Sequence, residues 1–558
     1  MKRFRLVVIS GQVGAGKSTL ARGLSAHYDA RHIRTRELLA LAAKARGQDL
    51  PLERASLQRF GAQLDRETAG RWVADSISAT VSGAAANSPL AQAHVPEALD
   101  NLLIVDSVRT QSQIDALREA FGGAVVHVHL FSATTVLARR YSQRLNSGIE
   151  ELKSYDDVAS DPTEAGVGDL KDDADVAIDT ERSNERDVLI RAAAALSLLP
   201  PADQRLVDVL IGGQYGSEGK GNVAFYLARE YDVLMRVGGP NAGHTVPMPS
   251  PYTHRLLPSG TLANGDARLV IGPGATLDVA LLQEEIAFCQ IEAARLSIDP
   301  QAMIIEPADR EFERTIVADI ASTGKGGGAA AARRILGRSA AAVDTPVRLA
   351  RDAPELAPYL EPTRDILSET FRSNRRVLLE GTQGTGLSLY HGHYPHVTSR
   401  DTTTSGTLAE SGIGPRRLRR VILVIRTYPI RVQNPDRDGT TSGYMSQEIT
   451  YEELADRSGI PLEELLETER GSVSGRQRRV AEFDWDLLRT SVELNGATDI
   501  ALTFADYISV KNRHAQRYDQ LTPDTIQFVE EVERVSGVPV SLITTRFDIR
   551  SVIDRRRW

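Results

Sequence analysis

Residues 212–222 read GGQYGSEGKGN. The glycines and the lysine are typical of a loop that wraps phosphate with backbone N–H groups, but Lys220 is followed by Gly221 where a Walker A loop has Ser or Thr. A strand-like apolar run at 206–211 precedes the stretch, as in a nucleotide-binding α/β domain. The stretch therefore predicts a variant nucleotide loop, with Ser217 at its centre.

A regular phosphate loop stands near the start of the chain, where residues 11–18 read GQVGAGKS. This is the pattern G-x-x-x-x-G-K-[ST], and it lies between a strand-like run at 4–10 and a helical pattern at 18–28. The lysine of such a loop reaches the β- and γ-phosphates, and the hydroxyl ligates Mg²⁺. The expected nucleotide-binding residues are Gly11, Gly16, Lys17 and Ser18, with Ser18 also a metal ligand.

An acidic residue, Asp106, follows the strand-like run 101–105. In a P-loop fold a carboxylate at that place supports the Mg²⁺ shell or acts on the phosphoryl acceptor, whereas a strand-ending turn is the structural alternative. The stretch HIRTRELL at 32–39 looks like the acceptor-binding stretch of adenylate kinases, and residues 1–198 resemble the nucleoside monophosphate kinase and dephospho-CoA kinase group. The resemblance implies a kinase and leaves its acceptor open.

The chain divides at a double proline. Residues 199–204 (LPPADQ) separate the end of one apolar pattern from a new strand-like run, which is typical of a linker. We expect one domain at 1–198 and another at 205–558. Both are expected to be α/β, P-loop-type domains with mainly parallel sheets flanked by helices, because strand-like and helical patterns alternate. The acidic stretch 145–175 is expected to be a loop within the first domain.

Composition argues against several kinds of partner. The net charge of −8 argues against a protein that coats nucleic acid, and no apolar run reaches the roughly 18 residues of a transmembrane helix. The opening residues MKRFRLVVISGQ are expected to form a strand rather than a signal peptide. Cys289 is the only cysteine, so an intramolecular disulfide is impossible. We expect a cytoplasmic enzyme whose partners include neither nucleic acid nor a membrane.

The second half carries a series of further motifs in order. They are QYGSEGKG (214–221), GGPNAGHT (238–245), PSG (258–260), STGKG (322–326), LEGTQGT (379–385), HGHYP (391–395), GIGP (412–415) and SGRQRR (474–479). Together they resemble the adenylosuccinate synthetase family, whose nucleotide loop has the form Q-W-G-D-E-G-K-G. The resemblance spans 205–558 and explains Gly221, because GKG is the family's own variant of the loop.

The resemblance implies a ligase that replaces the 6-oxo group of a purine nucleoside monophosphate with the amine of L-aspartate. A γ-phosphoryl group from ATP or GTP is transferred to O6 with Mg²⁺, and the amine then attacks C6 and expels phosphate. Phosphoryl transfer asks mainly for positioning and charge neutralisation, and the histidine of the family stabilises the transferring group or protonates the departing side. The expected catalytic residues are His244, Ser217, Lys220 and Gln383. The expected nucleotide-binding residues are Gly216, Gly219, Gly221, Asn241, Thr323, Thr398, Arg333 and Asp506. The expected metal-contacting residues are Ser18, Asp106 and Gly243.

The second substrate, L-aspartate, carries two carboxylates, which guanidinium groups bind bidentately. Arg476 and Arg478 match the aspartate-binding arginines of the family, with Ser474 where a threonine is usual. The family is homodimeric, and we expect a homodimer here. Arg333 matches the arginine that reaches across the dimer interface, and Arg334 is the alternative.

Ser217 departs from the family, which has an aspartate there as general base on N1–H and as Mg²⁺ ligand. A serine hydroxyl performs neither task well unaided. Either the enzyme is inactive, or its substrate has changed. Removing a carboxylate near N1 and C2 leaves more room and less negative charge beside position 2 of the purine, where guanine carries an amino group. The same change is a feature of the phage 2-aminoadenylosuccinate synthetases, so we favour GMP or dGMP as the acceptor.

The donor-base motif departs as well. The family's T-K-x-D motif is Thr503-Phe504-Ala505-Asp506 here, so Asp506 remains available to guanine N1–H and N2–H while the lysine is lost. We expect a loosened GTP preference, with ATP or dATP accepted. The alternatives left open are ordinary adenylosuccinate synthesis from IMP and a nucleotide-sensing regulatory or antiviral protein. The sequence separates neither ribose from deoxyribose at the acceptor nor ATP from GTP as the donor.

Overall fold

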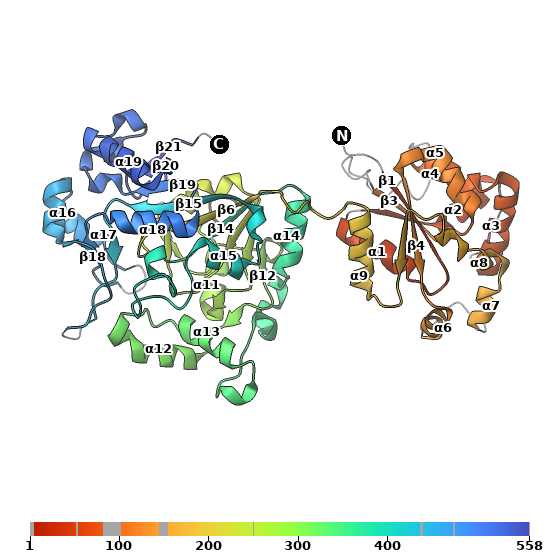
Figure 1. Cartoon of the computed structure of the whole chain (residues 1–558), viewed down its shortest axis with the longest axis horizontal. Helices are drawn as coiled ribbons and strands as arrows, with labels where there is room; N and C mark the ends of the chain where they lie inside the picture. The colour runs from red at the N-terminus through yellow and green to blue at the C-terminus, as the bar shows by residue number, and fades with distance from the viewer. Residues whose placement is uncertain are drawn as a thin grey trace. The chain divides into compact units, whose positions relative to one another are not determined.

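The computed structural model describes residues 5–28, 30–48, 50–51, 54–81, 102–143, 154–248, 250–435, 439–471 and 475–556. Internal contacts divide the chain into two compact units, Met1–Leu199 and Pro200–Trp558 (Figure 1). Each unit is built on its own sheet and is described by itself.

The N-terminal unit has a parallel sheet in the order β2-β3-β1-β4-β5. The strands are β1 (Arg5–Gly11), β2 (Arg31–Arg34), β3 (Leu102–Asp106), β4 (Val125–Phe131) and β5 (Val176–Asp179). The helices are α1 (Lys17–Tyr28), α2 (Thr35–Ala45), α3 (Arg54–Thr68), α4 (Arg71–Val81), α5 (Gln111–Phe121), α6 (Thr134–Ser142), α7 (Tyr155–Ala159), α8 (Pro162–Ala165) and α9 (Glu185–Ala195). Successive side chains of β1 point to opposite faces, so Leu6 and Val8 pack with α2 to α5, and Val7 and Ile9 pack with α1 and α9.

The C-terminal unit has a nine-stranded sheet in the order β12-β10-β7-β14-β6-β15-β19-β20-β21. Its strands are β6 (Val207–Gly212), β7 (Val233–Arg236), β10 (Arg268–Ile271), β12 (Leu296–Ile298), β14 (Val377–Glu380), β15 (Leu418–Arg426), β19 (Asp499–Thr503), β20 (Val540–Thr544) and β21 (Val552–Asp554). Only β21 pairs antiparallel in this sheet, with β20. Both sheets are thus mainly parallel and flanked by helices, which confirms the predicted fold class.

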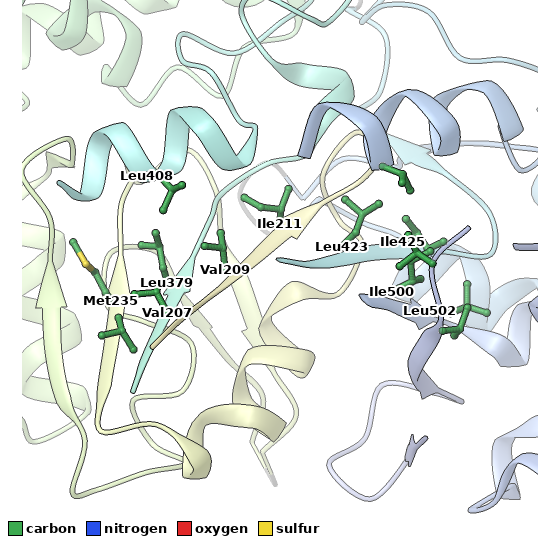
Figure 2. Close-up of a cluster of buried hydrophobic side chains, with 14 of the residues drawn as sticks. Val207, Val209, Ile211, Met235, Leu379, Leu408, Leu423, Ile425, Ile500 and Leu502 are labelled. Atoms are coloured by element: carbon green, nitrogen blue, oxygen red, sulfur yellow. The ribbon is translucent and has the colours of Figure 1, made fainter. Parts of the chain in front are cut away.

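Two apolar layers cover the faces of this larger sheet. Val207, Val209 and Ile211 of β6 pack on one face, where Leu408 also packs (Figure 2). Leu210 of β6 packs on the other face. The helices of the unit are α10 (Lys220–Leu227), α11 (Val279–Phe288), α12 (Pro307–Ile320), α13 (Gly327–Leu336), α14 (Thr363–Arg372), α15 (Thr404–Ser411), α16 (Tyr451–Ser458), α17 (Leu462–Thr468), α18 (Trp485–Asn495) and α19 (Pro523–Ser536).

Three smaller sheets lie outside the main one. They are β8 (His244–Val246) with β9 (Tyr252–His254), β11 (Thr276–Leu277) with β13 (Met303–Ile304), and β18 (Arg479–Ala481) between β16 (Ile430–Arg431) and β17 (Glu448–Ile449). Among the described residues, no helix combines the length and the apolar character that crossing a membrane requires.

The acidic stretch 145–175 is not simply a loop. Its described part contains α7, α8 and the short helix Asp169–Lys171, which begin at polar caps such as Ser154 and Asp161. The prediction was wrong there because these helices are short and their few apolar residues, such as Tyr155 and Val158, do not form a visible periodic pattern.

Candidate active site

The loop 213–219 joins β6 to the N-terminus of α10, so its backbone N–H groups and the helix dipole meet at one point. Glu218 organises this loop from inside. Its Oε1 accepts hydrogen bonds from the N–H groups of Gln214 at 3.1 Å and Gly216 at 2.8 Å, and its Oε2 lies 2.6 Å from Lys220 Nζ. Both members of the Glu218–Lys220 ion pair are buried, so the lysine is held ready beside the loop.

Ser217 differs from its neighbours in this loop. Its side chain is exposed, and its backbone has φ of 59°, in the left-handed region. The carbonyl of Ser217 accepts a hydrogen bond from Arg426 Nη1 at 3.1 Å. The loop is therefore held through the main chain of Ser217, while the side chain forms part of a cavity wall.

That cavity has a volume of about 500 Å³ and gathers most of the residues predicted for the site. The predicted residues in its wall are Gly216, Ser217, Lys220, Asn241, Gly243, His244, Thr323, Gln383, Thr398 and Arg478. Gly219 and Gly221 lie at the start of α10, and Gly219 has φ of 83°. The cavity lies at the carboxyl ends of parallel strands, where α/β sheets bind ligands.

Within the part of the chain that the structure describes, three buried oxygen atoms of this wall have no hydrogen-bond partner. They are Asn241 Oδ1, Thr323 Oγ1 and Gln383 Oε1. Buried polar groups are nearly always paired, so an orphaned set in one cavity indicates a polar ligand. All three residues belong to motifs singled out in the sequence.

His244, the first residue of β8, is held by a carboxylate. Its Nδ1 contacts Glu380 Oε1, and Glu380 also accepts hydrogen bonds from the N–H of Ser259 at 2.7 Å and from the Ser259 hydroxyl. Burial, with Arg236 nearby, lowers the pKa of His244 to about 4. Although burial alone would raise it, the charge of Arg236 and the contact with His244 hold the pKa of Glu380 at about 2. The pair is thus a neutral imidazole on an ionised glutamate, with Nδ1–H donating.

Of the two predicted aspartate-binding arginines, one lines the cavity and the other does not. Arg478 lines the cavity, and its Nη1 donates to Glu469 Oε2 at 3.1 Å. Arg476 follows Gly475, which has φ of 67°, and is not part of the cavity wall. Ser474 lies outside the described residues.

The donor-base segment 503–506 packs directly against the nucleotide loop. Thr503 Oγ1 donates to the carbonyl of Glu218 at 2.7 Å, and a Cβ placed on Gly219 would lie 3.4 Å from Phe504 Cε2. The Arg426 guanidinium lies 4.1 Å from the centroid of the Phe504 ring. The buried Arg426 guanidinium therefore lies beside the donor-base segment, in which Phe504 takes the place of the lysine of the T-K-x-D motif.

Asp506 is buried with one oxygen paired and one not. Oδ2 accepts from Arg513 Nε at 3.1 Å, whereas Oδ1 has no hydrogen-bond partner in the protein. Burial raises the pKa of Asp506 to about 6, and the neighbouring Arg513 limits the rise. The unpaired oxygen suits an N–H donor of a bound ligand.

Arg333 is held within its own chain. Its guanidinium is buried, and Nε and Nη2 bind the carboxylate of Asp309 at 2.9 and 2.6 Å. Nη2 also donates to the carbonyl of Ile304 at 3.0 Å, and Nη1 donates to that of Pro346 at 2.6 Å. The role of Arg333 at a partner's nucleotide stays a prediction. Arg334, the alternative, is half-buried and donates to the carbonyl of Pro273 at 3.1 Å.

The phosphate loop of the N-terminal unit joins β1 to α1. Lys17 Nζ donates to the carbonyls of Gly11 at 2.5 Å and Gln12 at 3.1 Å. The Ser18 hydroxyl donates to Asp106 Oδ2 at 3.3 Å, and His32 Nε2 lies 3.2 Å from the same oxygen. Burial alone would raise the pKa of Asp106, but the contacts with His32, Thr35 and Ser18 lower it.

The structure adds residues that the sequence did not assign. Arg431 lines the cavity with its guanidinium 4.8 Å from the Tyr215 ring, and burial lowers its pKa to about 10. Glu380 belongs to the motif LEGTQGT (379–385), but the sequence assigned it no role. Arg426 and Glu469 lie outside the assigned positions. Arg426 is a charge at the end of an apolar run, whereas Glu469 stands in an acidic stretch and carries no such signal.

The fold and this arrangement define a nucleotide-dependent α/β enzyme of the carbon–nitrogen ligase class. The sequence model described as adenylosuccinate synthetase matches residues 209–345 and 345–513. An adenylosuccinate synthetase of Pyrococcus sp. (strain ST700) is 38% identical over 362 residues, which are 62% of this chain and 98% of that protein. The chain therefore belongs to the adenylosuccinate synthetase family.

Solved structures show the same likeness. A succinoaminodeoxyadenylate synthetase of cyanophage S-2L, bound to dGMP and to dATP as an energy donor, matches with a TM-score of 0.52 and 26% identity, over 63% of this chain and 96% of that one. A fully ligated adenylosuccinate synthetase of Plasmodium falciparum shares the fold, with a TM-score of 0.54 and 20% identity over 63% of this chain and all (100%) of that one.

Proposed function

We propose that the C-terminal unit ligates L-aspartate to C6 of a guanine-type nucleoside monophosphate, GMP or dGMP, to give a succino-2-aminoadenylate. The observation that carries the proposal is Ser217, which stands in the wall of a cavity where the other expected groups are assembled. A serine leaves room that an aspartate would fill beside position 2 of the purine. The likeness to a phage enzyme solved with dGMP supports the same acceptor.

The chemistry follows from charge and proton positions. Lys220 and the loop N–H groups neutralise the triphosphate. Water takes the N1 proton of the acceptor as O6 takes up the γ-phosphoryl group, and the nucleoside diphosphate leaves. Bound phosphate would raise the pKa of the neutral His244, and the imidazole then donates from Nε2 to the transferring group while Glu380 holds Nδ1–H. Arg476 and Arg478 hold L-aspartate through its two carboxylates. The amine of L-aspartate attacks C6, and the C6–O bond breaks to release phosphate.

Magnesium fits the residues that are present. Ser18 and Asp106 in the N-terminal unit supply the hard oxygen atoms that Mg²⁺ prefers, and Gly243 has a carbonyl beside His244. Among the described residues no cluster of three or more His, Cys, Asp or Glu could hold a metal. When bound, Mg²⁺ neutralises charge on the phosphates.

The product identifies the acceptor. Purified full-length protein is incubated with Mg²⁺, L-aspartate and ATP or GTP, and IMP, dIMP, GMP and dGMP are offered separately. We expect a mass increase that corresponds to aspartate addition with loss of water on GMP or dGMP only. An adduct on IMP alone would assign ordinary adenylosuccinate synthesis, and absence of any adduct would favour a nucleotide sensor.

We propose that the donor can be ATP, dATP or GTP, with GTP binding dependent on pH. When Asp506 is ionised, its carboxylate accepts hydrogen bonds from the N–H groups of guanine. Below pH 6 a proton binds to the unpaired Oδ1, and this atom then donates a hydrogen bond instead of accepting one. Because the pKa is raised to about 6, the KM for GTP should rise about tenfold from pH 7 to pH 5. Adenine N1 accepts a hydrogen bond, so the KM for ATP should change much less.

The ATP series is the control for this experiment, because both triphosphates share the same phosphate ionisation. Asp506→Asn should flatten the GTP profile. Parallel GTP and ATP profiles in the wild-type protein would contradict the assignment of Asp506.

We propose that the N-terminal unit is a nucleotide kinase with its own donor site at Gly11, Gly16, Lys17 and Ser18. Lys17→Ala should lower aspartate-independent phosphoryl transfer to nucleoside monophosphates at least about tenfold, because Lys17 neutralises the donor phosphates. Ligation of aspartate should be unchanged. Lys220→Ala is the matched variant and should lower the ligation of aspartate while leaving phosphoryl transfer to nucleoside monophosphates unchanged. Loss of both activities in either variant would contradict two independent sites.

We propose a homodimer that uses the surface of α12 and α13. Phe312, Ile335 and Leu336 are each more than half exposed there, at 62%, 62% and 59%. Glu313 and Ile316 of α12 line the cavity, so a partner on this surface would stand next to the site. Sedimentation of the full chain, with Phe312→Ser as a comparison, measures the association.

A further inference from the structure

Arg426 connects three parts of the site. This residue ends β15, and its side chain is fully buried. Nη1 donates to the carbonyl of Ser217 in the nucleotide loop at 3.1 Å, and Nη2 donates to Glu469 Oε1 at 2.7 Å. The guanidinium carbon lies over the ring of Phe504 in the donor-base segment, 4.1 Å from its centroid.

Glu469 continues the connection to the aspartate side. Its Oε2 accepts from Arg478, which lines the cavity, and its Oε1 accepts from the Tyr507 hydroxyl at 2.5 Å. Burial alone would raise the pKa of Glu469, but Arg426 and Arg478 outweigh it and lower the pKa. One ionised carboxylate is therefore shared by two arginines, which leaves a net positive charge next to a cavity expected to hold anions.

A buried ion pair of this kind contributes little to stability compared with apolar packing. Its planar guanidinium does fix geometry, because Nη1 and Nη2 each donate to a different segment and a small rotation weakens both contacts together. Here the fixed parts are the nucleotide loop, the donor-base segment and the Arg478 side chain. The first two are expected to meet the donor triphosphate, and the third is expected to meet L-aspartate.

We propose that Arg426 and Glu469 are positioning residues that couple the donor nucleotide to L-aspartate. The proposal rests on the proposed function, because it takes Phe504 as the donor side and Arg478 as the aspartate side. A donor base against Phe504 restrains the Arg426 guanidinium, which fixes Glu469 and hence the Arg478 fork. Aspartate should bind more tightly when the donor is present, and the donor should gain by the same factor.

The chain contains a matched control for this network. At the other end of the same strands, Arg419 Nε donates to Asp208 Oδ1 at 2.8 Å, and the Tyr231 hydroxyl donates to Asp208 Oδ2 at 2.5 Å. Tyr507→Phe and Tyr231→Phe thus remove the same group from the same kind of buried pair. Only the first pair connects to the cavity.

The test measures the Kd of L-aspartate by calorimetry, with saturating acceptor, in the presence and absence of a non-hydrolysable triphosphate analogue. In the wild-type protein the analogue should lower this Kd by about tenfold. Tyr507→Phe should reduce the effect to less than about threefold, and Tyr231→Phe should keep it. Arg426→Lys keeps the charge but not the fork, and should also lose the coupling.

Each outcome separates the two proposals. If the wild-type protein forms no aspartate adduct, the proposed function fails. If it forms the adduct but the Kd does not respond to the analogue, or if both tyrosine variants lose the response equally, only the coupling role is overturned. Should Arg426→Lys fail to fold, Tyr507→Phe still decides, because it removes a single hydroxyl.

Discussion

Replacing His244 with asparagine should lower the kcat of aspartate-dependent phosphate release by about 10³-fold, because it removes the one imidazole in the cavity wall that rests on an ionised carboxylate. Asparagine keeps a donor near Glu380, so the fold should survive. Nε2 of the neutral histidine takes up a proton and becomes a donor only when phosphate is bound, and asparagine cannot take up that proton. Phosphate release is measured with saturating acceptor, donor and L-aspartate.

His27→Asn is the control, because this exposed histidine ends α1 in the other unit. It should leave ligation unchanged. A rate for His244→Asn within about threefold of the wild type would remove His244 from the mechanism, since general acid–base groups typically contribute at least about 10²-fold.

Replacing Ser217 with aspartate should move the acceptor preference from guanine to hypoxanthine. The carboxylate would fill the room beside position 2 and supply a base for N1–H. The ratio of kcat/KM for IMP to that for GMP should rise by about 10²-fold, the lower range of a general-base contribution. Aspartate is among the residues that tolerate the left-handed backbone found at this position, so the loop should keep its shape.

Ser217→Ala serves as the comparison for that result. It removes the hydroxyl without adding volume or charge, so the preference for GMP should remain. If Ser217→Asp still preferred GMP, the proposed origin of specificity would be wrong, and the acceptor would have to be selected elsewhere in the cavity wall.

Sequence patterns predicted the elements that depend on local order. The strands expected at 4–10, 101–105 and 206–211 are each shifted by one residue, to Arg5–Gly11, Leu102–Asp106 and Val207–Gly212, and each is a short, largely apolar run. Ten of the predicted site residues lie in the cavity wall, since glycine-rich loops follow strands whose carboxyl ends meet at one edge. These features are readable because neighbours in the sequence determine them.

The sequence did not predict which charged side chains far apart along the chain form ion pairs. Nothing near Arg333 in the sequence indicates that Asp309 binds its guanidinium, because the two residues are 24 positions apart and meet only in the folded chain. Arg426 and Glu469 lie 43 residues apart, and their partnership appears only when β15 and the segment after α17 come together. A buried charge acquires its meaning from the partner that folding brings to it.

The main-chain anchoring of Ser217 bears on how such enzymes diverge. Because Arg426 holds the carbonyl oxygen, which every amino acid possesses, a change of side chain at 217 leaves the anchor intact. If the side chain at 217 selects the purine as proposed, chemistry and structural integrity are separated at one codon. A lineage could then exchange one purine for another by a single replacement there, without first passing through a poorly folded ancestor.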